Sequence, residues 1–322
     1  MSAALSIGCT FSDRIEALLD GRVAIDGFAA DLRIVEAQRL FREVLQTQAY
    51  DVAELSMGSH IAAVAAGLQG GRRDYVGVPV FLSRSFRHGN LYVRTDRGID
   101  TPEDLAGKRI GLVDFQQTAA LWLRGLLADE YGVARESIRW TTAGLHAPVL
   151  TDRMAMDLPP GIRVERSPAT LDALLRAGEI DAIMSPTAPR CFADDTVPVA
   201  RLWRDPRAAE CDWWRRHRIF PIMHVLVVRR ALVEATPALP DALFAAFEQA
   251  RALAAADVAN RDFPKLVLPW LSSFAAEAHA ALGGDPWTYG VAANRDVLTT
   301  MLRYAVADGL APASLSVEDL FG

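Results

Sequence analysis

The sequence predicts an α/β fold of two lobes, arranged as a clamshell with a ligand cleft between them. The chain has 322 residues, of which 51% are hydrophobic, and this length favours two domains with sizeable cores. Apolar residues with helical spacing alternate with short apolar runs, which is the pattern of helices alternating with strands. One helix–turn–strand pattern also occurs twice, once in each half of the chain.

The first repeated pattern surrounds two aspartates. Around 40–48, apolar residues with helical spacing precede a short apolar run at 50–56, and the residues at 171–175 stand in the same relation to 180–185. Each pattern predicts an amphipathic helix, a tight turn and a buried strand. Each strand ends in small or polar residues, which is where α/β sheets bind ligands.

A second pair of segments supports the same plan. Strands are predicted at 5–8 and 108–113, and helices follow them at 14–19 and 118–131. Gly132 comes directly after the second helix and is expected to end it, because glycine readily adopts the left-handed conformation of a helix C-terminus.

The two lobes are predicted to be discontinuous. Lobe one takes 1–94 plus 200–322, and lobe two takes 95–199. The strand at 223–228 is expected to rejoin lobe one, and the alanine-rich helices beyond residue 232, at 241–258 and 294–306, are expected to pack on it. Two lobes joined by two crossings form a clamshell with a ligand cleft.

Composition excludes several classes of protein. A net charge of −6 does not suit a nucleic-acid-binding protein, and the aromatic-basic run at 213–217 is interpreted as a helix with packed tryptophans and solvated arginines. No apolar run reaches the roughly 18 residues of a membrane span, and the N-terminus lacks the pattern of a secretory signal. We therefore expect a cytoplasmic protein with no nucleic-acid or membrane partner; homo-oligomerisation is left open.

Cofactor motifs are missing from the sequence. It contains no P-loop and no GxGxxG, so nucleotide cofactors are not indicated and none is expected. Cys9, Cys191 and Cys211 have neither disulfide-framework nor zinc spacing. No metal motif occurs, but a divalent ion held by two histidines and Glu54 is left open.

Two distant segments carry the candidate catalytic residues. SRSFRH at 83–88 and FPIMH at 220–224 each place a histidine, His88 or His224, before an apolar run that ends in arginine. A histidine can take or give a proton near neutral pH. If the two strands are neighbours, the two imidazoles meet in the cleft. The alternative is a hydrogen-bonded structural histidine at either position.

Arginines in the first segment are candidates for binding an anion. Arg84 and Arg87 follow the apolar strand predicted at 76–82, and Ser83 adds a hydroxyl donor. A guanidinium offers a planar fork that fits a carboxylate with two hydrogen bonds. The alternative is a pair of solvated loop arginines.

Further candidates follow predicted strands in lobe two. Phe115, Gln116 and Thr118 lie where a strand joins a helix, and the N–H groups at a helix N-terminus can bind a carboxylate. Thr187 follows the counterpart strand. The alternative at 114–118 is ordinary helix capping.

One carboxylate in lobe one completes the set. Glu54 lies near the end of the strand at 50–56 and is the reserve general acid or base. The alternative is a salt-bridge partner, because acids are seldom buried unless they are paired.

Taken together, eight segments resemble the 4,5-dihydroxyphthalate decarboxylase family. The SRSFRH and FPIMH segments are specific, whereas the Asp-Leu-x-Gly-Lys segment occurs in many binding proteins. The similarity extends over nearly the whole chain. The matching segments lie at 50–56, 79–88, 92–99, 104–111, 158–162, 178–182, 219–224 and 289–295.

The resemblance implies a cytoplasmic enzyme of aromatic catabolism, as in phthalate degradation, on a fold like that of type II periplasmic binding proteins. It implies loss of one carboxylate from a hydroxylated aromatic dicarboxylate without an organic cofactor, most directly 4,5-dihydroxyphthalate giving protocatechuate. Arg84 and Arg87 would then hold the retained carboxylate, and His88 and His224 would share the acid and base roles in an unassigned order.

The sequence departs from the family pattern in two places. Thr187 stands where arginine is expected in many relatives, and 114–118 is also variant. Both lie in the expected cleft, so the ring substituents of the substrate are left open. The alternatives are a solute-binding protein that takes a small carboxylate or aromatic ligand without turnover, and another cytoplasmic enzyme on the same scaffold, resembling menaquinone-pathway proteins.

Overall fold

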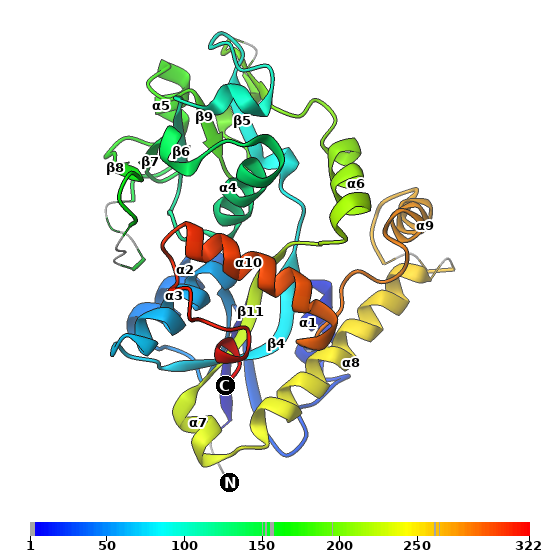
Figure 1. Ribbon diagram of the computed structural model, residues 1–322. Coiled ribbons are helices and arrows are strands. Elements are labelled where there is room, and N and C mark those ends of the chain that lie inside the picture. The colour runs from blue at the N-terminus through cyan, green and yellow to red at the C-terminus, as the bar shows by residue number, and fades with distance from the viewer. Residues whose placement is uncertain are drawn as a thin grey trace. The chain divides into compact units, whose positions relative to one another are not determined.

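Strands and helices alternate along most of the chain (Figure 1). The computed structural model describes residues 4–149, 151, 153–154, 158–194, 196–260, 262–263 and 265–322. Its strands are β1 Leu5–Cys9, β2 Ala30–Ile34, β3 Val52–Ser56, β4 Tyr75–Arg84, β5 Leu91–Arg94, β6 Arg109–Leu112, β7 Arg139–Thr142, β8 Arg163–Arg166, β9 Ala182–Met184, β10 Val199–Arg201 and β11 Ile222–Arg229. Its α-helices are α1 Asp13–Leu19, α2 Ala37–Thr47, α3 Met57–Leu68, α4 Thr118–Tyr131, α5 Leu171–Ala177, α6 Pro206–His217, α7 Arg230–Ala235, α8 Leu239–Ala259, α9 Leu271–Leu282 and α10 Arg295–Ala307.

The first sheet has the strand order β2-β1-β3-β11-β4. β1 pairs in parallel with β2 and β3, while β11 runs antiparallel between β3 and β4. Figure 1 shows β11 beside β4. Every residue of β3 is buried, as expected for a central strand covered on both faces. The long helix α8 packs against α1 and β4.

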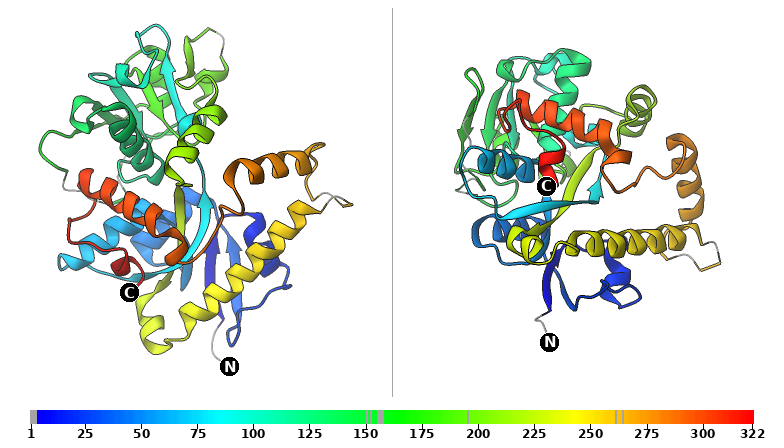
Figure 2. Two further views of the ribbon diagram at one scale, coloured as in Figure 1. Left: turned by 45° about the vertical axis from the view of Figure 1, so that its right-hand side comes forward. Right: turned by 60° about the horizontal axis from the view of Figure 1, so that its bottom comes forward.

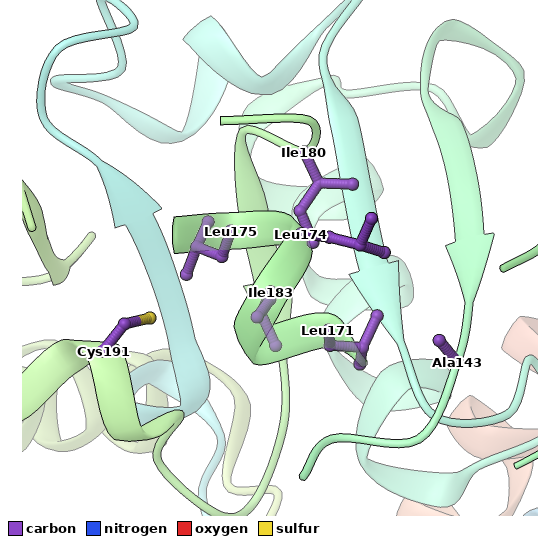
Figure 3. Close-up of a cluster of buried hydrophobic side chains, with 7 residues drawn as sticks. All are labelled: Ala143, Leu171, Leu174, Leu175, Ile180, Ile183 and Cys191. Carbon is purple, nitrogen blue, oxygen red and sulfur yellow. The ribbon is translucent and has the colours of Figure 1, made fainter. Parts of the chain in front are cut away.

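The second sheet has the order β10-β5-β9-β6-β7-β8. β6 pairs in parallel with β7 and β9, and β5 runs antiparallel to β9 and β10. An apolar cluster fixes α5 against this sheet, because α5 contributes three leucines to it (Figure 3). The cluster contains Ala143, Leu171, Leu174, Leu175, Ile180, Ile183 and Cys191.

The two sheets share one plan, which confirms the repeated pattern seen in the sequence. Strands β2-β1-β3-β11-β4 of the first correspond to β7-β6-β9-β5-β10 of the second, and β8 extends the second sheet. In each, a parallel run is followed by an antiparallel strand at the fourth position. A helix precedes β3 and β9 alike, as predicted.

The boundaries between the lobes were predicted wrongly. The first unit contains Met1–Arg84, Ile222–Leu298 and Ser316–Gly322, and the second contains Ser85–Pro221 and Thr299–Leu315. The predicted boundaries at 94/95 and 199/200 fail because β5 and β10 pair with each other and β5 pairs with β9, so both strands belong to the second sheet. The last predicted helix, now α10, is divided between the units rather than belonging wholly to lobe one.

The placement of the two histidines also differs from the prediction. His224 is the third residue of β11, so it lies inside its strand and not before it. His88 begins a short 3-10 helix, His88–Asn90, that precedes β5. Because β11 and β5 belong to different sheets, the two strands are not neighbours.

Most predicted helices are confirmed. α4 runs from Thr118 to Tyr131 and is capped by Gly132, which takes the left-handed conformation with φ of 64°. α8 covers the predicted helix at 241–258. No helix among the described residues is long and apolar enough to cross a membrane.

Candidate active site

Polar side chains from four strands gather at one edge of the first sheet. β1 and β3 are parallel neighbours, so Thr10, directly after β1, lies near the end of β3 that carries Glu54 and Ser56. β11 enters the sheet at the same edge, where His224 pairs with Ser56 on one side and with Ser83 of β4 on the other. The strand pairing therefore unites residues more than 200 positions apart.

Glu54 and His224 form a close pair at this edge. Nδ1 of His224 lies 2.5 Å from Oε1 of Glu54. Glu54 is buried, whereas the His224 side chain is 22% exposed. The ring of Phe41 meets the imidazole edge-on, with centroids 4.9 Å apart. Among the described residues, Nε2 of His224 has no hydrogen-bond partner. One ring nitrogen is therefore held by Glu54, and the other is free to contact a ligand.

Thr10 fixes the other oxygen of Glu54. Its backbone N–H and its hydroxyl both donate to Oε2, at 2.8 and 2.7 Å. Three donors thus orient one buried carboxylate. Sequence reasoning missed Thr10, because nothing in the residues around it marks a site. Only the pairing of the strand at 5–8 with the strand that carries Glu54, which was not predicted, could have pointed to it.

The electrostatics of Glu54 favour the ionised form. Burial alone would raise the pKa of Glu54, but the hydrogen bond and charge of His224 and the two donations from Thr10 outweigh it and lower the pKa. A carboxylate only accepts hydrogen bonds, so Nδ1 of His224 carries a proton and Nε2 is the atom available for proton exchange. Burial and the Glu54 charge raise the pKa of Cys9, so Cys9 remains a thiol.

Arg84 is the last residue of β4 and is buried. Its Nη2 donates to the carbonyl of Thr288 at 2.8 Å and to the side-chain oxygen of Asn294. Desolvation lowers its pKa to about 10, so it is still a cation at neutral pH. Arg84 therefore ties β4 to the segment before α10, a use that the prediction of a substrate anchor did not foresee.

Arg87 and His88 belong to the second unit. Arg87 donates to the Asn90 side chain at 3.0 Å, and desolvation lowers its pKa to about 10. His88 is 2% exposed and lies against Trp203 and Trp213, with ring centroids at 5.0 and 6.0 Å. Desolvation lowers the pKa of His88 to about 4, so its ring is neutral at neutral pH.

The segment 114–118 joins β6 to α4 in the second unit. Phe115 is buried between the guanidinium of Arg124, 3.9 Å from its ring centroid, and Trp140. It is therefore a core residue of this unit. Asp114 is buried too and is paired with Arg153 at 3.1 Å.

Two glutamines directly before α4 have buried polar atoms that lack partners in the described parts of the chain. Gln116 is 1% exposed and Gln117 is 8% exposed. Within the described parts of the chain, Nε2 of Gln116 and Oε1 of Gln117 have no hydrogen-bond partner. Thr118, the first residue of the helix, is also buried. A buried donor without a partner costs free energy, so a carboxylate placed here would gain hydrogen bonds as well as the helix dipole.

Thr187 follows β9, and the segment 114–118 follows β6. Because β9 and β6 are parallel neighbours, both segments lie at the same end of the second sheet. Ser185, directly after β9, is buried and accepts a hydrogen bond from the Thr187 backbone N–H at 3.3 Å. Thr187 itself is exposed. Among the described residues, no group of three or more His, Cys, Asp or Glu side chains is placed to hold a metal ion.

Solved structures with low sequence identity share this fold. A protein of Archaeoglobus fulgidus is 17% identical with a TM-score of 0.52, and covers 95% of this chain and 98% of its own. A putative periplasmic sulfonate-binding protein of Methylobacillus flagellatus is 14% identical with a TM-score of 0.56. The match covers 99% of this chain and 91% of that protein. These likenesses show a periplasmic-binding-protein-like fold and nothing of the function.

Curated proteins share much more of the sequence. A 4,5-dihydroxyphthalate decarboxylase of Comamonas testosteroni is 39% identical over 319 residues, which is 98% of this chain and 96% of the relative. A 4,5-dihydroxyphthalate decarboxylase of Pseudomonas putida is 38% identical over 213 residues, which is 66% of this chain and 81% of the relative. No family model matches the chain. Identity at this level over nearly the full length of both proteins shows that the chain belongs to the 4,5-dihydroxyphthalate decarboxylase family.

Proposed function

We propose that this protein is a cofactor-independent carboxy-lyase that acts on a hydroxylated aromatic dicarboxylate. The first candidate substrate is 4,5-dihydroxyphthalate, for which two curated relatives are named, and the products would be protocatechuate and carbon dioxide. The single observation that carries the proposal is the contact between buried Glu54 and partly exposed His224, which leaves one imidazole nitrogen free at the edge of a sheet.

The chemistry requires one proton to be removed and one to be delivered. Loss of the proton from the hydroxyl para to the departing carboxylate sends electron density to the ring carbon that carries it. That carbon then takes a proton from an acid. The bond to the carboxylate breaks, carbon dioxide leaves, and the bonding electrons restore the aromatic ring. The phenolate finally regains a proton.

We assign the proton donor to His224. The Glu54 carboxylate accepts the hydrogen bond from Nδ1–H and orients the ring, so that Nε2, when it carries a proton, can deliver it to the ring carbon. The predicted role of His88 as a second proton-transfer group stays a prediction, and its position among tryptophans favours packing.

The carboxylate that is retained needs its own donors. We propose the N-terminal end of α4, at Gln116 and Thr118, as a carboxylate-binding element of the second unit. Arg87 is a further candidate. Arg84 already donates to two oxygens within its own unit, so we assign it to positioning.

The test uses purified protein with 4,5-dihydroxyphthalate and measures carbon dioxide and protocatechuate. We expect turnover by the wild type, and a loss of about 10²-fold or more in kcat for His224→Gln, the usual size of an acid–base contribution. Glu54→Gln should also lose turnover, because it removes the negative charge that accepts the hydrogen bond from Nδ1–H of His224 and orients the ring. His217→Gln, altered at a half-exposed histidine paired with Glu130, is the control.

Two results would reject the proposal. Tight binding of the compound without any product would support a solute-binding protein. Turnover that survives in both His224→Gln and Glu54→Gln would remove the assigned roles. Metal analysis, with activity measured after chelation, tests the expected independence from a divalent ion. Cell fractionation tests the expected cytoplasmic location.

A further inference from the structure

α9 and the segment that leads into it form an arm of the first unit. The arm consists of residues 263 and 265–270 together with α9, and it follows the end of α8. Both views in Figure 2 show α9 projecting from the C-terminal end of α8. None of the 12 residues of α9 is buried. A helix without a fully buried residue gains little packing energy from its own chain, and tertiary packing is what stabilises most helices.

Exposed apolar side chains concentrate on this arm. Ten large apolar side chains are exposed in the described parts of the chain. Six of them lie on the arm itself, between positions 263 and 274. Val267 is fully exposed, and Trp270 is 66% exposed. The others on the arm are Phe263, Leu266, Leu268 and Phe274. Single exposed apolar residues are ordinary, whereas a contiguous group marks a contact surface.

The area of this surface matches a protein interface. An aromatic side chain carries about 150–250 Å² of surface, and leucine and valine lie near the lower end of that range, so the six side chains at their exposed fractions present roughly 700 Å². A standard interface buries about 800 Å² on each partner. The surface is therefore large enough for a stable protein contact.

A groove lies beside the arm in the same unit. It encloses about 550 Å³ between α8, α9 and the start of α1. Much of its lining is alanine, with Val258 and Trp287. Its charged lining residues are paired with one another or with near neighbours: Arg14 with Asp13 at 2.7 Å, and Arg251 with Asp285 and Glu248. Because these charges are compensated, the groove suits an apolar occupant better than an anionic ligand.

We propose that the arm of one copy of this chain packs into the groove of a second copy, forming a two-fold dimer. Every chain carries both the apolar arm and the apolar groove. A two-fold interface needs such a self-complementary surface, because each contact occurs twice. The proposal does not depend on the catalytic activity.

The first experiment measures the mass of the purified full-length protein in solution by light scattering, from about 1 to 100 μM. We expect a dimer, or a larger assembly built from dimers, for the wild type. The double variant Val267→Glu with Trp270→Glu should be reduced to half that mass. Leu68→Glu is the matched control, because Leu68 is 49% exposed at the end of α3, away from the arm, and should retain the wild-type mass.

The second experiment alters the groove and leaves the arm intact. Ala255 is exposed and lines the groove, so Ala255→Arg should block it and halve the mass. Ala256 is its exposed neighbour on α8 outside the lining, and Ala256→Arg should not change the mass. A thermal melt by circular dichroism confirms that each variant is folded; all the altered positions are exposed. If the arm variant aggregates, the groove pair decides the test.

Three results would overturn the proposal. The first is a monomeric wild type over the whole concentration range. The second is an assembly of unchanged mass in both the arm variant and Ala255→Arg. The third is dissociation by Leu68→Glu or Ala256→Arg to the same extent, which would show that the arm and groove are not specific.

Discussion

At the scale of single residues, the hydroxyl of Thr10 is the least expected part of the site. It reaches only Glu54, which in turn holds His224, so Thr10 acts as a positioning residue. The backbone N–H of Thr10 makes the same contact and survives any substitution. The side chain can therefore be tested without removing every donor to the carboxylate.

We predict that Thr10→Val raises the pKa of Glu54, because the carboxylate loses a donor that favours its charged form. The acidic limb of the profile of kcat/KM against pH should move to higher pH, and kcat should fall about tenfold with little change in KM. Thr10→Ser keeps the hydroxyl and should restore both. A purely structural role for Thr10 predicts lower thermal stability with an unmoved pH profile.

The site was predicted in part. His224 and Glu54 were both named from strand-end motifs, and the structure pairs them. Their mutual distance could not be predicted, because it depends on β11 entering the first sheet beside β3. Phe115 was assigned to the substrate, yet it is a core residue, since a local sequence pattern does not show which face of a turn is covered.

At the scale of elements, a buried ion pair joins α4 to the turn after α10. Arg124 of α4 donates through Nε and Nη2 to Asp308, at 2.8 and 2.5 Å, and neither side chain is exposed. Nη2 also donates to the carbonyl of Phe115 at 2.8 Å. Arg124 thus links the segment that leads into α4, beside the proposed carboxylate-binding element, to the turn after α10.

Asp308→Asn should lower the free energy of unfolding by about 3–5 kcal/mol, because it leaves the buried Arg124 charge without its counter-ion. Urea unfolding measures the change. Asp212→Asn removes a partner of Arg216 in an exposed pair on α6 and should cost under about 0.5 kcal/mol. Equal effects of the two substitutions would contradict this account.

Elements were predicted better than their pairing. The alternation of apolar residues places helices and strands, so α1, α4 and α8 agree closely with the predicted ranges. The sheet to which a strand belongs depends on backbone hydrogen bonds to distant segments. For this reason β5 was assigned to the wrong lobe, although it was correctly predicted to be a strand.

At the scale of the whole molecule, buried histidines set the response to acid. Desolvation lowers the pKa of His60 to about 4, although its hydrogen bond to the Leu320 carbonyl acts to raise the pKa. Desolvation also lowers the pKa of His88 to about 4. Both rings are neutral in the folded protein, whereas the unfolded chain binds protons from about pH 6.5 downward. The folded state binds fewer protons in this window, so stability is greatest above it.

We predict that the free energy of unfolding falls steadily as the pH is lowered from about 6.5 to 4, by on the order of 3 kcal/mol for each histidine. His60→Gln keeps a donor for Leu320 and should reduce the slope by up to one proton, and His88→Gln should do the same. Urea titrations at several pH values measure the slope. An unchanged slope in both variants would show that other groups control acid unfolding.

The position of β11 has a consequence for synthesis on the ribosome. This strand lies between β3 and β4, yet it is translated only after every strand of the second sheet. The edges of β3 and β4 that pair with β11 must therefore stay unpaired after β4 has been made. Some 140 further residues are added between the end of β4 at Arg84 and the start of β11 at Ile222. We expect the second sheet to form first and the nascent chain to engage chaperones meanwhile, and Glu54 meets its imidazole only when the late strand inserts.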